Sequence, residues 1–417
     1  MSPHAALHTM NTPGDLAGRV VWRPEGPHAG LHNLRPDLVS RLAAGRLGHD
    51  WPALVSSLLS MCGEAHRLTA RLALAAAQGQ ASTWSDTDAL TLQTETVREH
   101  LRRMWLDWPR LWPTPQPPDD RALTALHRAP VLQGPVTRLI ADPQQAQHTL
   151  VATQAWAASE VFDLGCEDWL RQWLQGGEPW LANWCRQAHT WPARWLRDVR
   201  PWAQDLCVPL RPWRPDDRTH LNHAHNPGGL CDLAERLRTQ PEATRQPSWP
   251  GQDAVETGPW CRLHAPTPHH APQGRSLWWR LAARLAELAR LLLPSATAGL
   301  GATGRAVLHH QALSLPGHSG LAWVEMARGT LLHWVQLDHA GPEARLLAAR
   351  VLSPTEWNFA AQGPVARMLQ GLPRSAHDPR TSPLAALVVA AWDPCVPFVI
   401  LSDHDTPPPM PEEPHHA

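Results

Sequence analysis

Apolar side chains recur at helical spacing in three separate stretches of the chain. In residues 50–78, 94–108 and 276–293, apolar or small residues return every three or four positions. A stripe with that period lies along one face of an α-helix and is normally buried. The pattern therefore predicts three long helices, each packed through one face against the rest of the protein.

The first of these helices carries two residues with ligand chemistry. Asp50 and Pro52 stand where a helix N-terminus favours a capping acid and a proline, so we expect the helix to begin there. Cys62 and His66 are four residues apart within the stretch. Because residues at that spacing lie one above the other on a helix, the sequence predicts that the thiol and the imidazole share a face.

Two further patterns complete the predicted fold class. Residues 150–215 combine many tryptophans with scattered prolines. This indicates short helices packed through aromatic side chains, with an aromatic recognition surface as the alternative. Residues 330–337 and 343–352 show a period closer to two and are separated by a turn-forming stretch, so we expect a β-hairpin there. Together these elements predict an α+β protein that is mostly helical.

Proline-rich breaks divide the chain into regions. Residues 113–120 hold too many prolines for a helix or a strand. We expect a helical N-terminal lobe over residues 1–118, a Pro- and Trp-rich helical region over 119–250 and a C-terminal lobe over 251–403. Residues 404–417 are rich in Pro, Glu and His and are expected to form a disordered tail.

Composition and charge exclude several classes of protein. The net charge is −1, and a nucleic-acid binder normally carries an excess of positive charge. The longest strongly apolar run, residues 384–392, is far shorter than the roughly 20 residues that a membrane span needs. Residues 1–18 lack the apolar core of a signal peptide, and the seven cysteines include no C-x-x-C pair. We expect a cytoplasmic protein with no membrane span that binds no nucleic acid.

One histidine cluster stands out by composition. His220, His223 and His225 precede an Asn-Pro-Gly-Gly sequence that indicates a loop. Because their spacing fits one face of neither a helix nor a strand, we expect a solvated loop, and a metal site is the alternative. The chain contains no Gly-x-Ser-x-Gly and no P-loop.

Segments near both ends of the chain resemble the metal-binding motifs of nickel–iron hydrogenase large subunits. Cys62-Gly-Glu-Ala-His66 resembles the second half of their C-G-x-C-x-x-x-H motif, and Asp393-Pro-Cys395 resembles the start of D-P-C-x-x-C. Three more segments follow the family's order between them, resembling E-x-G-P-x-A-R, E-A-P-R-G-x-L-x-H-W and P-T-x-W-N: residues 256–262, 324–334 and 353–358. The resemblance implies a hydrogenase large-subunit-like fold.

The chain departs from that family at half of the nickel site. In a hydrogenase, four thiolates hold nickel, and two of them bridge to an iron that carries two cyanides and one carbon monoxide. Here the other two cysteine positions fall on Leu59 and Phe398, and the histidine after the second motif falls on Leu401. The remaining Cys62 and Cys395 can hold an iron fragment but cannot complete a four-sulfur nickel cage.

This pattern is similar to the hydrogenase expression and formation accessory proteins of the HupK/HoxV type. The resemblance implies a maturation scaffold, not an enzyme, that binds iron transiently as an Fe(CN)2(CO) unit without nickel. Its implied partners are the hydrogenase large-subunit precursor and the chaperone complex that delivers the iron. It also implies Cys62 and Cys395 as iron ligands, His66 as a hydrogen-bond donor to sulfur, and Arg328 beside the cyanides.

Two other functions remain compatible with these residues. One is a divergent, catalytic hydrogenase large subunit, which the missing cysteines disfavour. The other is a metal-free structural partner with the same fold. Infrared spectra and metal analysis separate the three, because only the scaffold holds cyanide-bearing iron without nickel. The remaining polar and aromatic residues of the matched segments are expected to be structural: Glu256, Glu325, His333 and Trp357.

Overall fold

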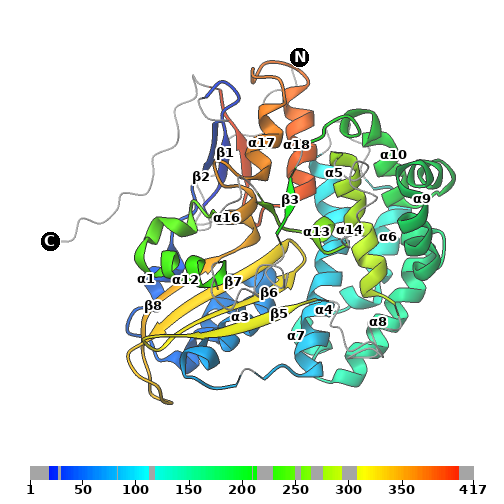
Figure 1. The fold of residues 1–417 in the computed structure, drawn as a ribbon. Coiled ribbons are helices and arrows are strands. Elements are labelled where there is room, and N and C mark those ends of the chain that lie inside the picture. The colour runs from blue at the N-terminus through cyan, green and yellow to red at the C-terminus, as the bar shows by residue number, and fades with distance from the viewer. Residues whose placement is uncertain are drawn as a thin grey trace.

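A four-stranded sheet and a large group of helices lie side by side (Figure 1). The predicted tail, the His220 cluster and most of the proline-rich stretch at 113–120 lie outside the residues that the structure describes. The computed structural model describes residues 18–26, 30–81, 83–111, 118–208, 210–213, 229–248, 255–263, 276–293 and 308–402.

The sheet is antiparallel, with the strand order β5-β6-β7-β8. Its last two strands form the predicted hairpin, in which Leu332 lies opposite Leu352. The first two strands were not predicted, because β6 is buried along its whole length and shows no alternation of polar and apolar residues. The strands are β5 (His310–Leu315), β6 (Ser319–Met326), β7 (Gly329–Leu337) and β8 (Leu346–Leu352).

Helices cover both faces of this sheet (Figure 1). On one face, α3 (Gly63–Ala77) packs so closely on β6 that a Cβ at Gly320 would lie 2.1 Å from the carbonyl oxygen of Ala73. On the other face, α12 (Leu230–Thr239) packs against tryptophans of β6 and β7 in a second, smaller core. Successive residues of a strand point to opposite faces, so both cores draw on the same strands.

The first predicted helix is interrupted, and the prediction of one helix over residues 50–78 is wrong. α2 (Trp51–Leu58) and α3 are joined by a 3-10 turn. Leu59 leaves the helical conformation with φ −111° and ψ 48°. The helices then approach so closely that a Cβ on Gly63 would lie 2.8 Å from the carbonyl oxygen of Ser56. Apolar periodicity runs through this break, so the sequence pattern could not reveal it.

The second predicted helix is longer than its apolar stripe. α4 (Asp86–Arg102) begins at a capping box formed by Ser85 and Asp88, ahead of the predicted start at residue 94. It continues through a π-helical turn, η5 (Arg103–Asp107), into α5 (Trp108–Leu111). Buried Thr, Gln and Glu side chains in α4 interrupt the apolar stripe, which is why the pattern missed its first turns.

The third predicted helix is confirmed as α14 (Leu277–Leu291). Ser276 caps it, because the Ser276 hydroxyl accepts a hydrogen bond from the Trp279 amide. Its polar face is not solvated, however: Arg280, Arg284 and Glu287 are at most 5% exposed. A buried charge requires a partner of opposite charge, and these side chains contribute to the site described below.

The tryptophan-rich stretch forms a helical core, as predicted. Trp173 stacks on Trp279 of α14 with ring centroids 4.6 Å apart, and Trp108 stacks on Trp195 at 4.1 Å. Offset and edge-to-face ring contacts of this kind add to the energy of area burial. The helices of this stretch are α8 (Pro143–Ala157), α9 (Cys166–Gln187) and α10 (Trp191–Ala203).

The two ends of the described chain meet in a small sheet. β1 (Val20–Trp22) pairs in antiparallel fashion with β2 (Leu31–Asn33) and in parallel fashion with β9 (Phe398–Ile400). α18 (Thr381–Trp392) leads into β9 through the Asp-Pro-Cys motif, so this pairing draws the C-terminal motif toward the N-terminal segments. One hydrophobic cluster extends from Val20 to Val396, and the predicted division into lobes stays a prediction.

The remaining elements connect these layers. Among the described residues, no helix is long and apolar enough to cross a membrane. The elements are α1 (Leu38–Ala43), α6 (Asp120–Arg128), α7 (Val136–Leu139), β3 (Arg211–Pro212), β4 (Val255–Glu256), α13 (Pro259–Leu263), α16 (Pro354–Asn358) and α17 (Pro364–Gln370).

Candidate metal centre

One cavity of about 460 Å³ brings together all four residues that the resemblance implied. Cys62 ends the 3-10 turn before α3, and His66 lies in the first turns of α3. Arg328 lies in the turn between β6 and β7, and Cys395 follows α18. Three segments that are distant in sequence therefore contribute their side chains to a single space.

Cys62 is buried at the N-terminus of α3, where it is the N-cap residue. Burial raises the pKa of the Cys62 thiol well above its usual value, the Cys395 thiol raises it further, and Arg328 opposes the shift. The free thiol is consequently neutral, while a bound soft metal favours the thiolate.

Glu95 of α4 fixes the turn that carries Cys62. Its carboxylate accepts hydrogen bonds from the amides of Glu64 and Ala65, each at 2.9 Å. These amides belong to the first turn of α3 and have no partner within the helix. Burial raises the pKa of Glu95 to about 7, although the two amide bonds oppose this shift. A side chain from a neighbouring helix thus determines where Cys62 lies.

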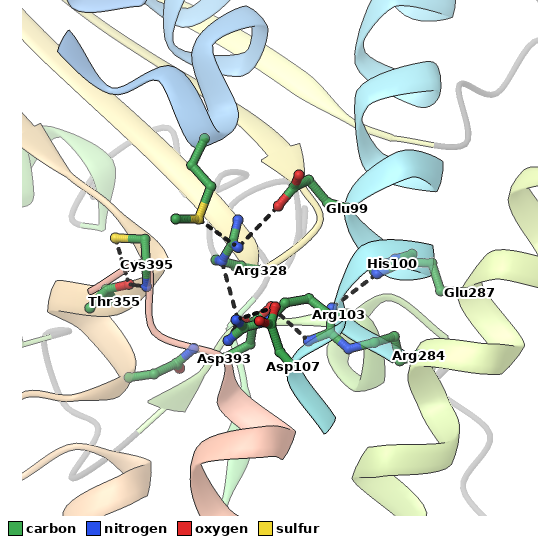
Figure 2. Close-up of polar contacts among 12 residues, drawn as sticks. Glu99, His100, Arg103, Asp107, Arg284, Glu287, Arg328, Thr355, Asp393 and Cys395 are labelled. Atoms are coloured by element: carbon green, nitrogen blue, oxygen red, sulfur yellow. Dashed lines mark hydrogen bonds and ion pairs between the residues drawn. The ribbon is translucent and has the colours of Figure 1, made fainter. Parts of the chain in front are cut away.

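The half-buried Cys395 is held by Thr355, the second residue of α16 (Figure 2). The Thr355 hydroxyl lies 3.2 Å from the Cys395 sulfur and accepts a hydrogen bond of 3.1 Å from the Cys395 amide. The same hydroxyl can therefore donate to the sulfur while it orients the backbone. Thr355 lines the cavity and was not predicted as a site residue.

Arg328 is buried, and two of its donor atoms, Nε and Nη1, make no hydrogen bond within the described residues. Its Nη2 lies 3.1 Å from both the Glu99 carboxylate and the Met61 sulfur, and its Nε lies 3.5 Å from Asp393. Nη1 is buried and, in the part of the chain that the structure describes, makes neither a hydrogen bond nor an ion pair. Burial by itself lowers the pKa of Arg328, but Glu99 and the thiols of both cysteines raise it above its usual value.

His66 contacts a second histidine within the core. Its Nδ1 lies 3.0 Å from Nε2 of His333, a residue of β7. Burial lowers the pKa of His66 well below its usual value and lowers the pKa of His333 to about 3. Both rings are therefore neutral near pH 7, and one of the two facing nitrogens must donate to the other.

An ionic cluster lies next to Arg328 and is defined by Asp393, Arg103, Arg284, Glu287, His100 and Arg262 (Figure 2 shows the first five). Asp393 forms ion pairs with Arg103, with Arg284 at 3.3 Å and with Arg328. Glu287 accepts hydrogen bonds from His100 at 2.7 Å and from Arg262 at 2.6 Å. Although burial opposes it, Arg262 lowers the pKa of Glu287 to about 2.

The positions of the two missing cysteines differ in their surroundings. Leu59 lines the cavity, so a thiol at this position would face the other two. Phe398 lies in β9 and packs edge-to-face on Phe359, with ring centroids 6.4 Å apart, and is not among the cavity-lining residues. Among the described residues, no cluster of three or more His, Cys, Asp or Glu is arranged to hold a metal ion.

The residues expected to be structural are all buried and bonded. Glu256 forms a double ion pair with Arg280 at 2.8 and 2.9 Å. Glu325 accepts a hydrogen bond from the His309 amide, and the Trp357 indole donates to the carbonyl of Val255.

Besides Thr355, sequence reasoning missed four charged residues around the cavity. Single charged residues in polar segments carry no periodic signal, although one of the four sits in the matched P-T-x-W-N segment. They are Arg35, Glu95, Glu99 and Glu356.

Comparison with curated proteins gives two relatives that span nearly the whole chain, while no known family profile matches it. The chain is 36% identical over 395 residues to hydrogenase expression/formation protein HoxV of Cupriavidus necator, which covers 92% of this chain and 95% of that protein. It is 31% identical over 372 residues to hydrogenase expression/formation protein HupK of Rhizobium leguminosarum bv. viciae. This alignment covers 88% of this chain and 90% of that protein.

Solved structures support the predicted fold class. The Ni-Fe-Se hydrogenase from Desulfovibrio vulgaris Hildenborough matches in its reduced state with a TM-score of 0.51 and 14% identity, covering 88% of this chain and 92% of that chain. The same enzyme in its as-isolated oxidised state matches with a TM-score of 0.50 and 14% identity, and the match covers 87% of this chain and 92% of that chain. The α+β, hydrogenase large-subunit-like fold is confirmed, and the chain belongs to the family of hydrogenase expression/formation proteins that HoxV and HupK represent.

Proposed function

We propose that this protein is a non-catalytic accessory protein of nickel–iron hydrogenase maturation, and that its cargo is an Fe(CN)2(CO) fragment. The observation that carries the proposal is that Cys62, Cys395 and Arg328 line one cavity, and that Nη1 of Arg328 is buried without a hydrogen-bond partner among the described residues. The family relationship to HoxV and HupK supports the maturation role. Hydrogenase catalysis is not part of the proposal, because two of the four nickel-binding thiols are replaced.

The two thiols are suited to hold iron without retaining it permanently. Thiolates are soft ligands that bind iron carrying strong-field diatomic ligands. Cys62 and Cys395 must each lose a proton on loading, since metal binding selects the thiolate. Leu59 adds an apolar wall where a hydrogenase has a further thiol, so the cargo has two covalent anchors here and nickel has no complete site. Fewer anchors favour release to an acceptor.

Arg328 supplies the polar contact that the cargo needs. A cyanide bound through carbon presents a nitrogen lone pair with negative charge, and a guanidinium is a strong donor to such an acceptor. Nη1 of Arg328 is buried without a hydrogen bond, which costs free energy until an acceptor arrives. Glu99 and Asp393 hold the rest of the guanidinium in place.

His66 acts on the Cys62 sulfur only in one tautomer. If its Nε2 carries the proton and donates to the thiolate, its Nδ1 must accept, so Nε2 of His333 must be the donor. The His66–His333 contact is satisfied in that tautomer, and binding of cargo to Cys62 favours it.

The partners in this proposal are a cytoplasmic hydrogenase large-subunit precursor and the chaperone complex that delivers the iron. A carrier must contact both its donor and its acceptor, if only briefly. Affinity capture of the tagged protein from anaerobic, hydrogenase-expressing cells should recover both, and the Cys62→Ala/Cys395→Ala variant should recover less precursor. Capture of neither partner under these conditions would contradict the maturation role.

A further inference from the structure

A second arginine, Arg35, faces the same cavity and has no role in the account above. It lies between β2 and α1, in a segment that none of the matched motifs includes. Its side chain is 18% exposed, and it lines the cavity together with Cys62, Cys395 and Arg328. An arginine this enclosed must be paired or have a ligand, because burial of an isolated charge is costly.

The protein partners of Arg35 occupy only one end of its guanidinium. Its Nη1 contacts the Glu356 carboxylate and lies 3.4 Å from the Ser353 hydroxyl. Glu356 is held in turn by the capping box of α16, in which it accepts a hydrogen bond from the Ser353 amide at 2.9 Å. Within the described residues, Nη2 and Nε of Arg35 donate no hydrogen bond, so two donor atoms remain available on a residue of the cavity wall.

Both arginines and both thiols line the same cavity. Burial lowers the pKa of Arg35, but its neighbours, Glu356 first among them, raise it above its usual value. Glu99 likewise raises the pKa of Arg328 against the effect of burial. Both guanidiniums therefore stay charged, and the two sulfurs share a cavity with two fixed cations.

Two fixed cations discriminate between kinds of metal cargo. Both guanidiniums repel a bare divalent ion at the thiols, and this repulsion weakens binding of the ion without its anionic ligands. A fragment that carries two anionic diatomic ligands offers an acceptor to each guanidinium and gains charge-assisted hydrogen bonds. The same residues thus weaken binding of one species and strengthen binding of the other.

We propose that Arg35 is a second anion-binding residue of the site, and that Arg35 and Arg328 together make the cavity selective for iron bearing two anionic ligands over the bare ion. This inference rests on the proposed function and adds the basis of selectivity to it. Arg35 does not bind the metal; it acts on the anionic ligands and, through charge, on the ion.

The test compares two cargoes on the same variant, Arg35→Gln. For protein purified anaerobically from hydrogenase-expressing cells, the infrared cyanide bands per chain should fall about tenfold or more, the usual loss for one charge-assisted hydrogen bond in a closed site. For metal-free protein dialysed against ferrous ion alone, binding should be unchanged or tighter, since one repelling charge is gone. A purely structural role would weaken both.

Two further variants control the experiment. Glu356→Gln keeps the capping box but frees Arg35 from its counter-charge, so cyanide bands should be retained while ferrous ion binds more weakly. Arg46→Gln removes an exposed arginine of the same N-terminal region, whose Nε contacts only the Leu42 carbonyl, and should change neither measurement.

The outcomes separate this inference from the proposed function. Parent protein without cyanide bands would overturn the proposed function and this inference with it. Parent protein with bands that Arg35→Gln retains in full would overturn the inference alone, as would equal loss of cyanide bands and of ferrous-ion binding. Opposite responses of the two cargoes to Arg35→Gln are the result that the inference predicts.

Discussion

Two groups of charged residues meet at Arg328, and they differ in how their charges are compensated. In the ionic cluster, Asp393 contacts three arginines, and Glu287 contacts Arg262 and His100. At the cavity, Nη1 of Arg328 has no acceptor among the described residues, and two cysteines share the lining with two arginines.

The difference teaches how to separate support from function in one buried region. A charge whose partners are all supplied by the protein positions its neighbours and has nothing left to offer a ligand. A buried donor without a partner costs free energy in the empty protein, and on a residue of a cavity wall a ligand can complete it. Changes in the cluster should therefore affect stability first, and changes in the cavity should affect cargo first.

The largest effect on cargo is expected when one of the two cavity thiols is removed. Cys62→Ala or Cys395→Ala should reduce hydrogenase maturation in cells to background, because each removes half of the covalent anchorage, while the folded protein persists. Hydrogenase activity beside the soluble amount of the variant measures both effects.

The matched controls are cysteines buried among the helices. Cys166→Ala and Cys185→Ala should leave maturation largely intact, and so should Cys207→Ala at an exposed position. Equal tolerance at all five positions would rule out the two-thiolate site.

The ionic cluster should show the opposite behaviour. Glu287→Ala leaves Arg262 without its buried counter-charge and should lower the free energy of unfolding by about 3–5 kcal/mol, as for other buried pairs that lose one partner. Urea denaturation measures the loss. Glu235→Ala, in an exposed pair with Arg238, should leave the urea midpoint unchanged. A cluster variant with parental stability would contradict the supporting role.

Acid should weaken the protein through its buried histidines. Burial lowers the pKa of His100 to about 4 and of His333 to about 3, from 6.5. Between pH 6.5 and about 4 the unfolded chain binds more protons, so each histidine should lower the free energy of unfolding by about 1.4 kcal/mol per pH unit as the pH falls. Urea midpoints across this range test the slope.

Glu95 acts in the other direction and supplies a control for the acid effect. Burial raises its pKa from 4.5 to about 7, so its contribution to stability grows as the pH falls through that interval. Glu95→Gln should therefore steepen the acid loss of stability. An unchanged slope in this variant, or a parent whose stability is flat from pH 6.5 to 4, would contradict the assignment.

The smallest expected effects concern the replaced cysteine positions. Leu59→Cys adds a third thiol to the cavity wall and should raise bound iron per chain while it lowers maturation, because firmer retention opposes transfer. Phe398→Cys should leave bound iron unchanged and cost about 1–3 kcal/mol of stability, because its ring packs on Phe359 outside the cavity lining. Metal analysis and urea denaturation distinguish the two. If both variants and the parent bound the same amount of iron per chain, the replacement of a cysteine by Leu59 would have no effect on iron retention.

The sequence predicted the parts of the site that motifs encode. Cys62, His66, Arg328 and Cys395 were identified from ordered short segments, and they line one cavity. The fold class followed from the same segments. The resemblance supplied these residues, because the matched segments keep the family's order along the chain.

The residues that hold these side chains in place could not be predicted in the same way. Glu95 caps α3 across 30 residues of chain, and Arg35 meets Glu356 across more than 300. Such contacts depend on tertiary packing and leave no periodic signal. The break at Leu59 was hidden for a related reason, since apolar side chains on both sides of it are buried and keep the stripe continuous.

The most direct test of the account is an infrared spectrum with metal analysis of the protein purified anaerobically from hydrogenase-expressing cells. We predict cyanide and carbonyl bands, iron without nickel, and loss of both bands in the Cys62→Ala/Cys395→Ala variant. A parent protein without these bands, or bands that persist when both thiols are absent, would contradict the claim that Cys62 and Cys395 hold the iron fragment.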